Sequence, residues 1–262
     1  MSRQDRLSRI LALVVERGAV EVDDVALELK VSSATVRRDF DTLAKRQLLS
    51  RTHGGAVATG SSIGLPLSYK VAKDDEVKQR IAKEAVKLIE RYQVIGINGG
   101  TTTTEVARAI AADPKFAPID ELQPALTVVT NAINIATELT VRHQIKIMVT
   151  GGVARPHSYE LTGPFAEEVL REVNIDIAIL GVEALDPHKG AAARHEDEAR
   201  VNRQIAARAD KIVVVTDSSK FTKSAFASIR PVSEIDILIT DKAVGDEVVN
   251  MMMDQGVEVI LV

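Results

Sequence analysis

The sequence contains no cysteine and no tryptophan, and aromatic residues make up only 3% of its 262 positions. The lack of cysteine excludes disulfide bonds, thiol nucleophiles and cysteine-bound metals. With so few aromatic side chains, we do not expect a surface that stacks the bases of single-stranded nucleic acid. No apolar run approaches the length of a membrane span, and the amino-terminal residues are charged and amphipathic, unlike a secretory signal. We therefore expect a cytoplasmic protein with no membrane partner.

Charge is distributed unevenly along the chain, although the net charge is only −4. Residues 1–60 carry ten Lys and Arg against eight Asp and Glu, which gives a net charge of +2. The remaining residues carry 23 against 29, which gives −6. A mildly basic first part and an acidic remainder are compatible with nucleic-acid binding by the first part alone.

Three short segments in the first part have apolar residues at helical spacing, and a Gly-Gly turn follows them in "LLSRTHGGAVAT". In the third segment, Val36, Phe40 and Leu43 share one face. Three helices and a basic hairpin are typical of a winged helix-turn-helix, whose third helix enters the DNA major groove. We predict this domain over residues 1–57, followed by a linker rich in Gly, Ser and Pro over residues 58–74.

The face of the third helix opposite its apolar stripe is the predicted DNA-reading surface. Arg37 and Arg38 can reach guanine edges or phosphates, and hydroxyl groups near the helix start can reach base edges. Asp39 would repel phosphates, so we interpret it as an orienting partner of the two arginines. An ordinary solvated helix is the alternative that this short motif leaves open. The residues predicted to contact DNA are Ser33, Thr35, Arg37, Arg38, Thr42, Lys45, Arg51 and His53.

Beyond the linker, β-branched runs alternate with helix-like segments. The runs are "VIGI", "LTVVT", "IKIMVT", "IDIAILG", "KIVVVTD", "IDILIT" and "VEVILV". They lack polar alternation, which is expected of strands covered on both faces. The pattern predicts a Rossmann-like α/β domain with a mostly parallel sheet over residues 75–262.

Five of these strands end in polar or Gly-rich stretches, which in a parallel sheet gather at one edge and form the usual ligand site. The first is "NGGTTTT", where glycines permit close approach and a helix start suits a phosphate. The other ends begin at Thr130, Gly151, Gly181 and Asp217. Each loop taken singly is as compatible with a structural turn as with a binding site.

Several enzyme and cofactor classes do not fit these loops. The first loop lacks the Gly-Lys-Ser/Thr ending of a nucleotide P-loop and the full dinucleotide fingerprint. The five histidines have no zinc-protease spacing. Ser219 beside Lys220 could form a nucleophile pair, but the sequence shows no third group to orient it. We therefore predict no cofactor, no metal and no catalytic residue.

The block "SSATVRRDF" (Ser32 to Phe40) and the hairpin "RTHGGA" (Arg51 to Ala56) resemble the DNA-binding head of DeoR-family bacterial transcription regulators. The similarity extends through "TGPFAEEVL", "DEARVNRQ" and "DSSKF" and covers almost the whole chain. It implies a carboxyl-terminal domain similar to ribose-phosphate isomerases and coenzyme A transferases that binds a sugar phosphate as effector. One departure is Asn98, where many members carry Asp.

By this resemblance, the residues from Gly100 to Thr103 would hold the phosphate and other strand ends would line the remaining site. The predicted effector-binding residues are Asn98, Gly99, Gly100, Thr101, Thr102, Thr103, Thr130, Asn131, Gly151, Gly152, Arg155, Glu198 and Lys220. The predicted function is a transcriptional regulator, in particular a repressor of a carbohydrate-metabolism operon, with double-stranded operator DNA and a phosphorylated sugar as partners. We also expect a homo-oligomer, either a dimer or a tetramer. The alternative is a sugar-phosphate isomerase or transferase with an accessory DNA-binding head.

Overall fold

The computed structural model describes residues 3–45, 48–57, 76–119 and 123–262. The chain divides into two compact units, residues 1–74 and 75–262, and each is described by itself. The predicted linker, 58–74, lies outside the described residues.

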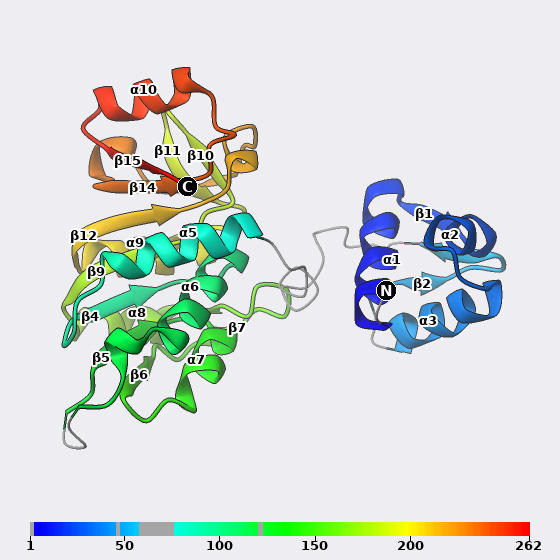
Figure 1. The fold of residues 1–262 in the computed structure, drawn as a ribbon, viewed down its shortest axis with the longest axis horizontal. Coiled ribbons are helices and arrows are strands. Elements are labelled where there is room, and N and C mark those ends of the chain that lie inside the picture. The colour runs from blue at the N-terminus through cyan, green and yellow to red at the C-terminus, as the bar shows by residue number, and fades with distance from the viewer. Residues whose placement is uncertain (1–2, 46–47, 58–75, 120–122) are drawn as a thin grey trace. The chain divides into compact units, whose positions relative to one another are not determined.

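The described residues of the first unit form three helices (Figure 1) and a three-stranded antiparallel sheet in the order β1-β3-β2. Its elements are α1 (Arg3–Arg17), β1 (Ala19–Glu21), α2 (Val22–Leu29), α3 (Ser33–Lys45), β2 (Ser50–Arg51) and β3 (Gly55–Val57). The predicted three helices and hairpin are confirmed. Strand β1 was not predicted, since three residues are too few to show a pattern. Gly55 permits this pairing, because a Cβ atom there would lie 2.0 Å from the Val20 carbonyl oxygen.

Packing of α3 follows its predicted apolar stripe. Val36, Phe40 and Leu43 are fully buried, together with apolar residues of α1 and α2. Burying each side chain contributes about 1.5–3 kcal/mol, so this stripe fixes the rotation of α3 about its own axis. The opposite face of the helix is consequently left to solvent. Ser32, just before the helix, accepts a hydrogen bond from the Thr35 amide at 3.2 Å and so caps the helix start.

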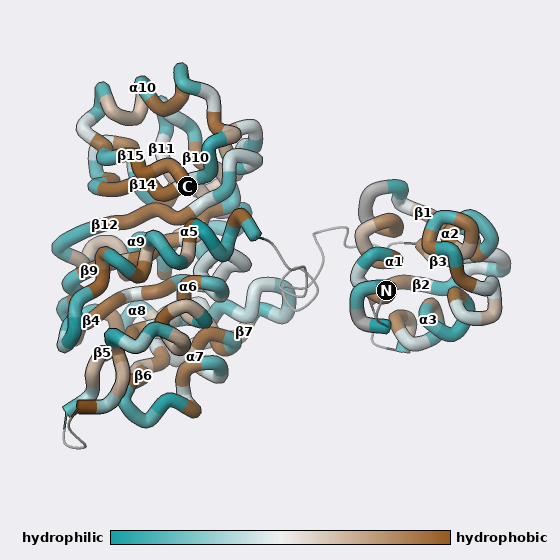
Figure 2. The backbone as a smooth tube through the Cα atoms, in the orientation of Figure 1, coloured by the Kyte–Doolittle hydropathy of each residue, from teal (hydrophilic) through white to brown (hydrophobic). Residues whose placement is uncertain are grey.

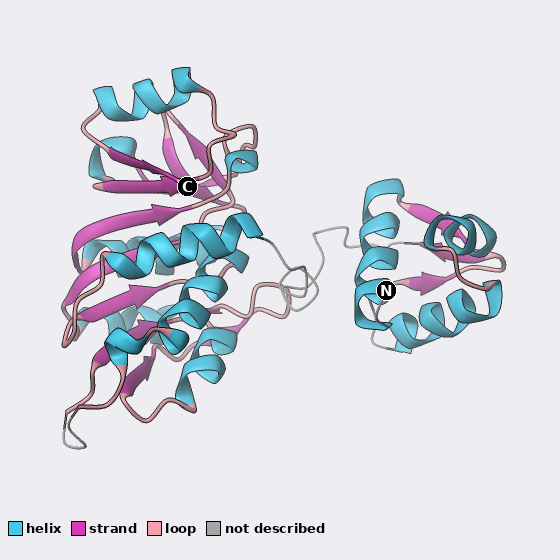
Figure 3. Ribbon diagram, viewed as in Figure 1, coloured by secondary structure: helices cyan, strands magenta, loops and turns pink. Residues whose placement is uncertain are grey.

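The second unit is built on a seven-stranded parallel sheet in the order β15-β14-β12-β9-β4-β5-β6, with the strands labelled in Figure 1 and drawn as magenta arrows in Figure 3. Its strands are β4 (Val94–Ile97), β5 (Leu126–Thr130), β6 (Ile145–Val149), β9 (Ile175–Leu180), β12 (Ala209–Val215), β14 (Ile237–Thr240) and β15 (Glu258–Leu261). All seven predicted runs form these strands, and the predicted parallel α/β fold is confirmed.

Helices cover both faces of this sheet. They are α5 (Glu76–Lys87), α6 (Thr101–Ala112), α7 (Ile133–Thr140), α8 (Pro164–Arg171), α9 (Glu196–Ala207) and α10 (Asp246–Asp254). Apolar residues of α5, α6 and α7 pack on one face, and those of α8, α9 and α10 pack on the other. Figure 2 shows the large strands as largely hydrophobic tubes, as a sheet buried on both faces requires.

Short elements complete the second unit and were not predicted. β7 (Val153–Ala154) pairs antiparallel with β8 (Leu161–Thr162). A three-stranded antiparallel sheet is formed by β10 (Ala184–Asp186), β11 (Gly190–Ala193) and β13 (Ala227–Arg230). The 3-10 turns are η1 (Pro114–Phe116), η2 (Ser218–Lys220) and η3 (Val232–Glu234). They connect or follow the large strands and carry many of the polar loops.

Candidate functional site

The exposed face of α3 presents three cations. Arg37, Arg38 and Lys45 are exposed, and within the described part of the chain their side chains have no hydrogen bond or ion pair. Unpaired arginines on the open face of a third helix are free to contact phosphates or guanine edges.

The hydroxyl groups predicted to contact DNA already have partners inside the protein. The Ser33 hydroxyl donates to Asp23 on α2 at 2.8 Å, and the Thr35 hydroxyl lies 2.8 Å from that of Ser32. The Thr42 hydroxyl donates to the Arg38 carbonyl at 2.8 Å. These groups fix the start and the turns of α3, and the unpaired cations are better placed to contact DNA.

Asp39 differs from the sequence-based interpretation. It is 2% exposed and pairs with Arg6 of α1, with Nε–Oδ2 at 2.5 Å and a second contact at 3.3 Å. The carboxylate therefore joins α3 to α1, and it does not pair with Arg37 or Arg38. The sequence could not indicate this, because the partner lies 33 residues away.

The hairpin of β2 and β3 carries the remaining two predicted DNA contacts. Arg51 lies 3.4 Å from Asp41 and its guanidinium stands over the Phe40 ring at 5.6 Å, so the hairpin is held against α3. His53 is exposed at the turn.

In the second unit, the order in which the chain adds strands to the sheet reverses between β4 and β9. The chain runs from β4 outward to β5 and β6, and then resumes on the other side with β9, β12, β14 and β15. Loops after β4 and β9 diverge at such a switch point, which is where parallel sheets bind ligands. Asn98 bridges the two loops, because its amide donates to the Gly181 carbonyl at 2.9 Å and accepts from the Gly181 amide at 2.8 Å.

Helix α6 begins at this switch point, directly after the two glycines. Gly100 has φ of 154° and caps the helix, and the Thr104 amide donates to its carbonyl. The amides of the first helical turn have no acceptor within the helix, and the helix dipole makes them a favourable place for an anion. Thr101 is half-buried, whereas Thr102 and Thr103 are buried.

Two of the predicted effector contacts at the end of β5 are buried. Thr130 is 0% exposed, its hydroxyl donates to the Ile97 carbonyl at 2.6 Å, and it accepts from the Ala132 amide at 3.0 Å. Asn131 is also fully buried, and its side-chain oxygen has no partner among the described residues. The geometry gives Thr130 a structural role that joins β5 to β4, and leaves Asn131 with a free acceptor.

Replacing Thr130 with valine should therefore reduce stability without changing effector binding. Loss of the hydroxyl leaves the Ala132 amide and Ile97 carbonyl unpaired, which costs about 1–3 kcal/mol. Urea unfolding measures the loss, with Thr137→Val as control, because the Thr137 hydroxyl lies on the exposed side of α7. A variant of unchanged stability that binds sugar phosphates more weakly would contradict this assignment.

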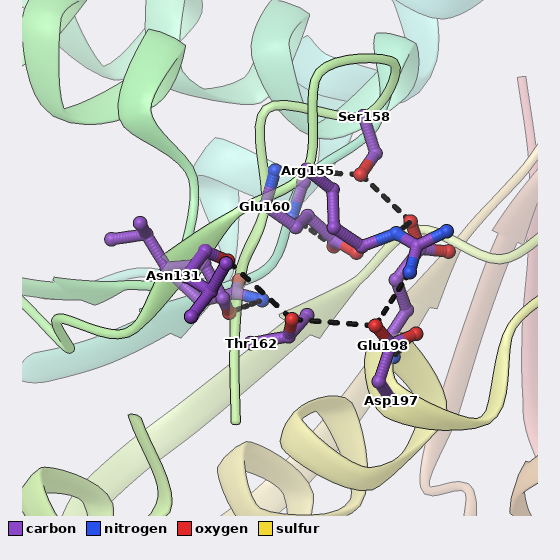
Figure 4. A network of polar contacts seen from close by, with 10 residues as sticks. Asn131, Arg155, Ser158, Glu160, Thr162, Asp197 and Glu198 are labelled. Atoms are coloured by element: carbon purple, nitrogen blue, oxygen red, sulfur yellow. Dashed lines mark hydrogen bonds and ion pairs between the residues drawn. The ribbon is translucent and has the colours of Figure 1, made fainter. Parts of the chain in front are cut away.

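Figure 4 shows a polar network between the β7–β8 loop and the start of α9. Arg155 contacts Asp197 at 2.5 Å and Glu198 at 3.1 Å, and Ser158 donates to Glu198 at 2.7 Å. These contacts hold the pKa of Arg155 above and that of Asp197 below their ordinary values, although partial burial opposes both shifts. The two predicted residues Arg155 and Glu198 thus lie together, and their charges largely neutralise one another.

Glu160 was not predicted as a site residue, yet it contacts the loop after β4, which was predicted to hold the phosphate. Its Oε1 accepts a hydrogen bond from the Gly99 amide at 2.8 Å, and the residue is 3% exposed. Burial and the neighbouring Glu198 raise the pKa of Glu160 to about 8. The sequence signal was weak, a single acidic residue in "SYELTGP" with no polar strand end beside it.

The other predicted effector residues lie after β6 and β12. Gly151 and Gly152 are exposed after β6, with φ of 72° and 113°, and a Cβ on Gly152 would lie 2.5 Å from the Thr162 carbonyl oxygen. Lys220, on η2 after β12, lies 3.4 Å from Glu183 in the loop after β9. Burial lowers the pKa of Lys220, and Glu183 opposes that shift.

Neither a metal site nor a membrane-spanning helix is found among the described residues. In that part of the chain no group of three His, Asp or Glu side chains could hold a metal ion. Nor does any helix in the described ranges have the length and apolar character to cross a membrane.

Comparison with known proteins agrees with both units. A model of the DeoR-like helix-turn-helix domain matches residues 6–62, and a model of the DeoR C terminal sensor domain matches residues 73–242. The HTH-type transcriptional regulator GlpR of Haloferax volcanii is 36% identical over 90% of this chain and 89% of that protein. The glycerol-3-phosphate regulon repressor of Escherichia coli is 28% identical over 98% of both chains.

Solved structures show a slighter likeness. A D-ribose-5-phosphate isomerase in complex with phospho-erythronic acid aligns with a TM-score of 0.41 and 24% identity, over 56% of this chain and 54% of that one. The two relatives that match over nearly their whole length are named as a transcriptional regulator and a regulon repressor. With matches to both DeoR domains and full-length relatives of this kind, the chain belongs to the DeoR family of transcriptional regulators.

Proposed function

We propose that the protein is a repressor of a carbohydrate-metabolism operon, whose affinity for operator DNA falls when a phosphorylated sugar binds its sensor domain. The phosphate occupies the start of α6 at the switch point of the sheet. We also propose that the protein acts in the cytoplasm, as a dimer or tetramer.

The free cations on α3 support the DNA-binding half of the proposal. A recognition helix needs unpaired donors on its outer face, and Arg37, Arg38 and Lys45 supply them. A two-fold oligomer would present two such helices to two half-sites, which increases both affinity and specificity. The acidic composition of the second unit favours keeping the sensor domain away from DNA.

The start of α6 supports the effector-binding half of the proposal. Its first-turn amides point out of the carboxyl edge of the sheet, next to two glycines and a half-buried threonine. This combination suits a phosphate and lacks the lysine that a nucleotide loop requires. One relative is named for the glycerol-3-phosphate regulon, which is compatible with a phosphorylated effector here.

A thermal-shift screen of pentose, hexose and triose phosphates tests the effector half. A ligand that binds only the folded protein at a hundred times its dissociation constant stabilises it by about 2.7 kcal/mol. For a domain of this size that raises the melting temperature by roughly 5–10 °C. The matching unphosphorylated sugars are the controls. Equal shifts with sugar and sugar phosphate, or no shift at all, would count against a phosphate site.

A further inference from the structure

The carboxyl group of Glu160 accepts a hydrogen bond from the Gly99 amide, which would otherwise be free to bind a ligand. The residue lies in the loop between β7 and β8, and its carboxyl group reaches across to the loop that follows β4. A Cβ atom on Gly99 would lie 2.4 Å from Glu160 Cγ. The close packing of this glutamate therefore leaves no space for a side chain at position 99.

The surroundings of Glu160 do little to favour its negative charge. From α9, Glu198 faces it as a like charge and Asn202 donates a hydrogen bond to it. From its own loop, Arg155 faces it, but that guanidinium is already paired with Asp197 and Glu198. From the β4–α6 loop the Gly99 amide donates to it. A buried carboxyl group with one like charge and no cation of its own is easily protonated.

We propose that Glu160, when ionised, competes with the effector's phosphate for the Gly99 amide, so that phosphate binds well only when this carboxyl group is neutral and a weak acceptor. The inference rests on the proposed phosphate site at α6. Ionised Glu160 and a phosphate dianion at neighbouring amides would repel each other in a largely buried setting, where the repulsion is weakly screened. When Glu160 takes up a proton from solvent, the repulsion is lost and the loop amides remain available.

The pH dependence follows from this competition. Since the pKa of Glu160 is about 8, the group is mostly neutral at pH 7 and mostly ionised at pH 9. If phosphate binds only to the neutral form, the dissociation constant should rise about tenfold between these two pH values. A phosphate monoester stays a dianion throughout this range, because its second pKa is about 6.

The variant Glu160→Gln tests the idea, because it keeps the shape and an oxygen that accepts from Gly99 but carries no charge. Titration calorimetry with glycerol 3-phosphate, ribose 5-phosphate and glucose 6-phosphate should be done at pH 7 and pH 9. At pH 7 the variant and the parent protein should bind the same probe within about twofold, and at pH 9 the variant should bind it about tenfold more tightly. Lys220 also loses charge toward high pH, but it does so in both proteins, so the difference between them isolates Glu160.

Glu167→Gln is the matched control. Glu167 is likewise buried, at 4% exposure, and pairs with Arg200 at 2.6 Å. This variant should keep the pH dependence of the parent protein. If Glu160→Gln binds a probe with the same pH dependence as the parent, the competition is refuted and the phosphate site stands. If none of the three probes binds either protein, the proposed function is refuted and the competition with it.

A measurement on the unchanged protein removes any dependence on the variant's folding. The amide nitrogen and proton shifts of Gly99 should titrate between pH 7 and pH 9 in the free protein, with a midpoint near the Glu160 pKa. Adding a probe that binds should abolish this titration, because the phosphate then occupies the amide. A Gly99 amide that does not titrate, or that titrates identically with the probe bound, would overturn the proposal.

Discussion

Replacing both Arg37 and Arg38 with alanine is expected to weaken operator binding at least about 30-fold. Each arginine that contacts a base or a phosphate contributes about 1–3 kcal/mol, and both are unpaired on the exposed face of α3 among the described residues. Fold stability should change little, since neither side chain is part of the core. Fluorescence anisotropy of a duplex obtained by repeated selection from random DNA measures the loss.

The double variant Arg9→Ala, Arg17→Ala is the control for net charge. Both side chains are exposed on α1 and pair with Glu28, so the same charge is removed from the same unit. If α3 reads the operator, this control should keep the affinity within a few-fold. Equal losses in the two double variants would mean that DNA is attracted by general charge and not recognised by α3.

Replacing Thr101 with glutamate is expected to weaken binding of a sugar phosphate at least about 100-fold. A carboxylate about 4 Å from the phosphate is repelled by about 4 kcal/mol at an effective dielectric constant near 20. The fold should tolerate the change, because Thr101 is half-buried and an acidic side chain is favourable in the first turn of a helix. Thr102, which is buried, would be a poorer choice for this test.

The variant Thr101→Gln has a side chain of similar size to glutamate but no charge, so it separates the effect of the negative charge from that of side-chain size. It should bind the sugar phosphate within about tenfold of the parent protein, and it should release DNA in response to it. Thr101→Glu should still bind the operator but should no longer respond to the sugar phosphate. A glutamate variant that binds the effector as well as the glutamine variant would exclude the start of α6 as the phosphate site.

The fold could be predicted from the sequence where the pattern is local. Seven β-branched runs form the seven strands, and the stripe of Val36, Phe40 and Leu43 is buried as expected. Both signals depend only on the spacing of apolar residues within one element. The strands β7, β8 and β10 have only two or three residues, which is too few to show such spacing, and β11 and β13 contain no run of β-branched residues.

The candidate sites were less predictable, because they depend on contacts between distant residues. The strand-end rule placed Asn98 and Gly99 at the carboxyl edge of the sheet, but it could not indicate the switch point or distinguish ligand contacts from structural ones. Thr130 has the polarity of a ligand residue, yet its hydroxyl group is used between β4 and β5. Conversely, Glu160 has no motif of its own, and only the folded chain brings it to Gly99, 61 residues away.

Coupling of the effector to DNA is the central claim, and one titration tests it. The full chain is bound to its selected operator duplex, and the sugar phosphate that gives the largest thermal shift is added while anisotropy is followed. We predict that operator affinity falls at least about fivefold, and by linkage that the operator weakens the sugar phosphate's affinity by the same factor. Unchanged operator affinity at a saturating concentration of that sugar phosphate would contradict the account.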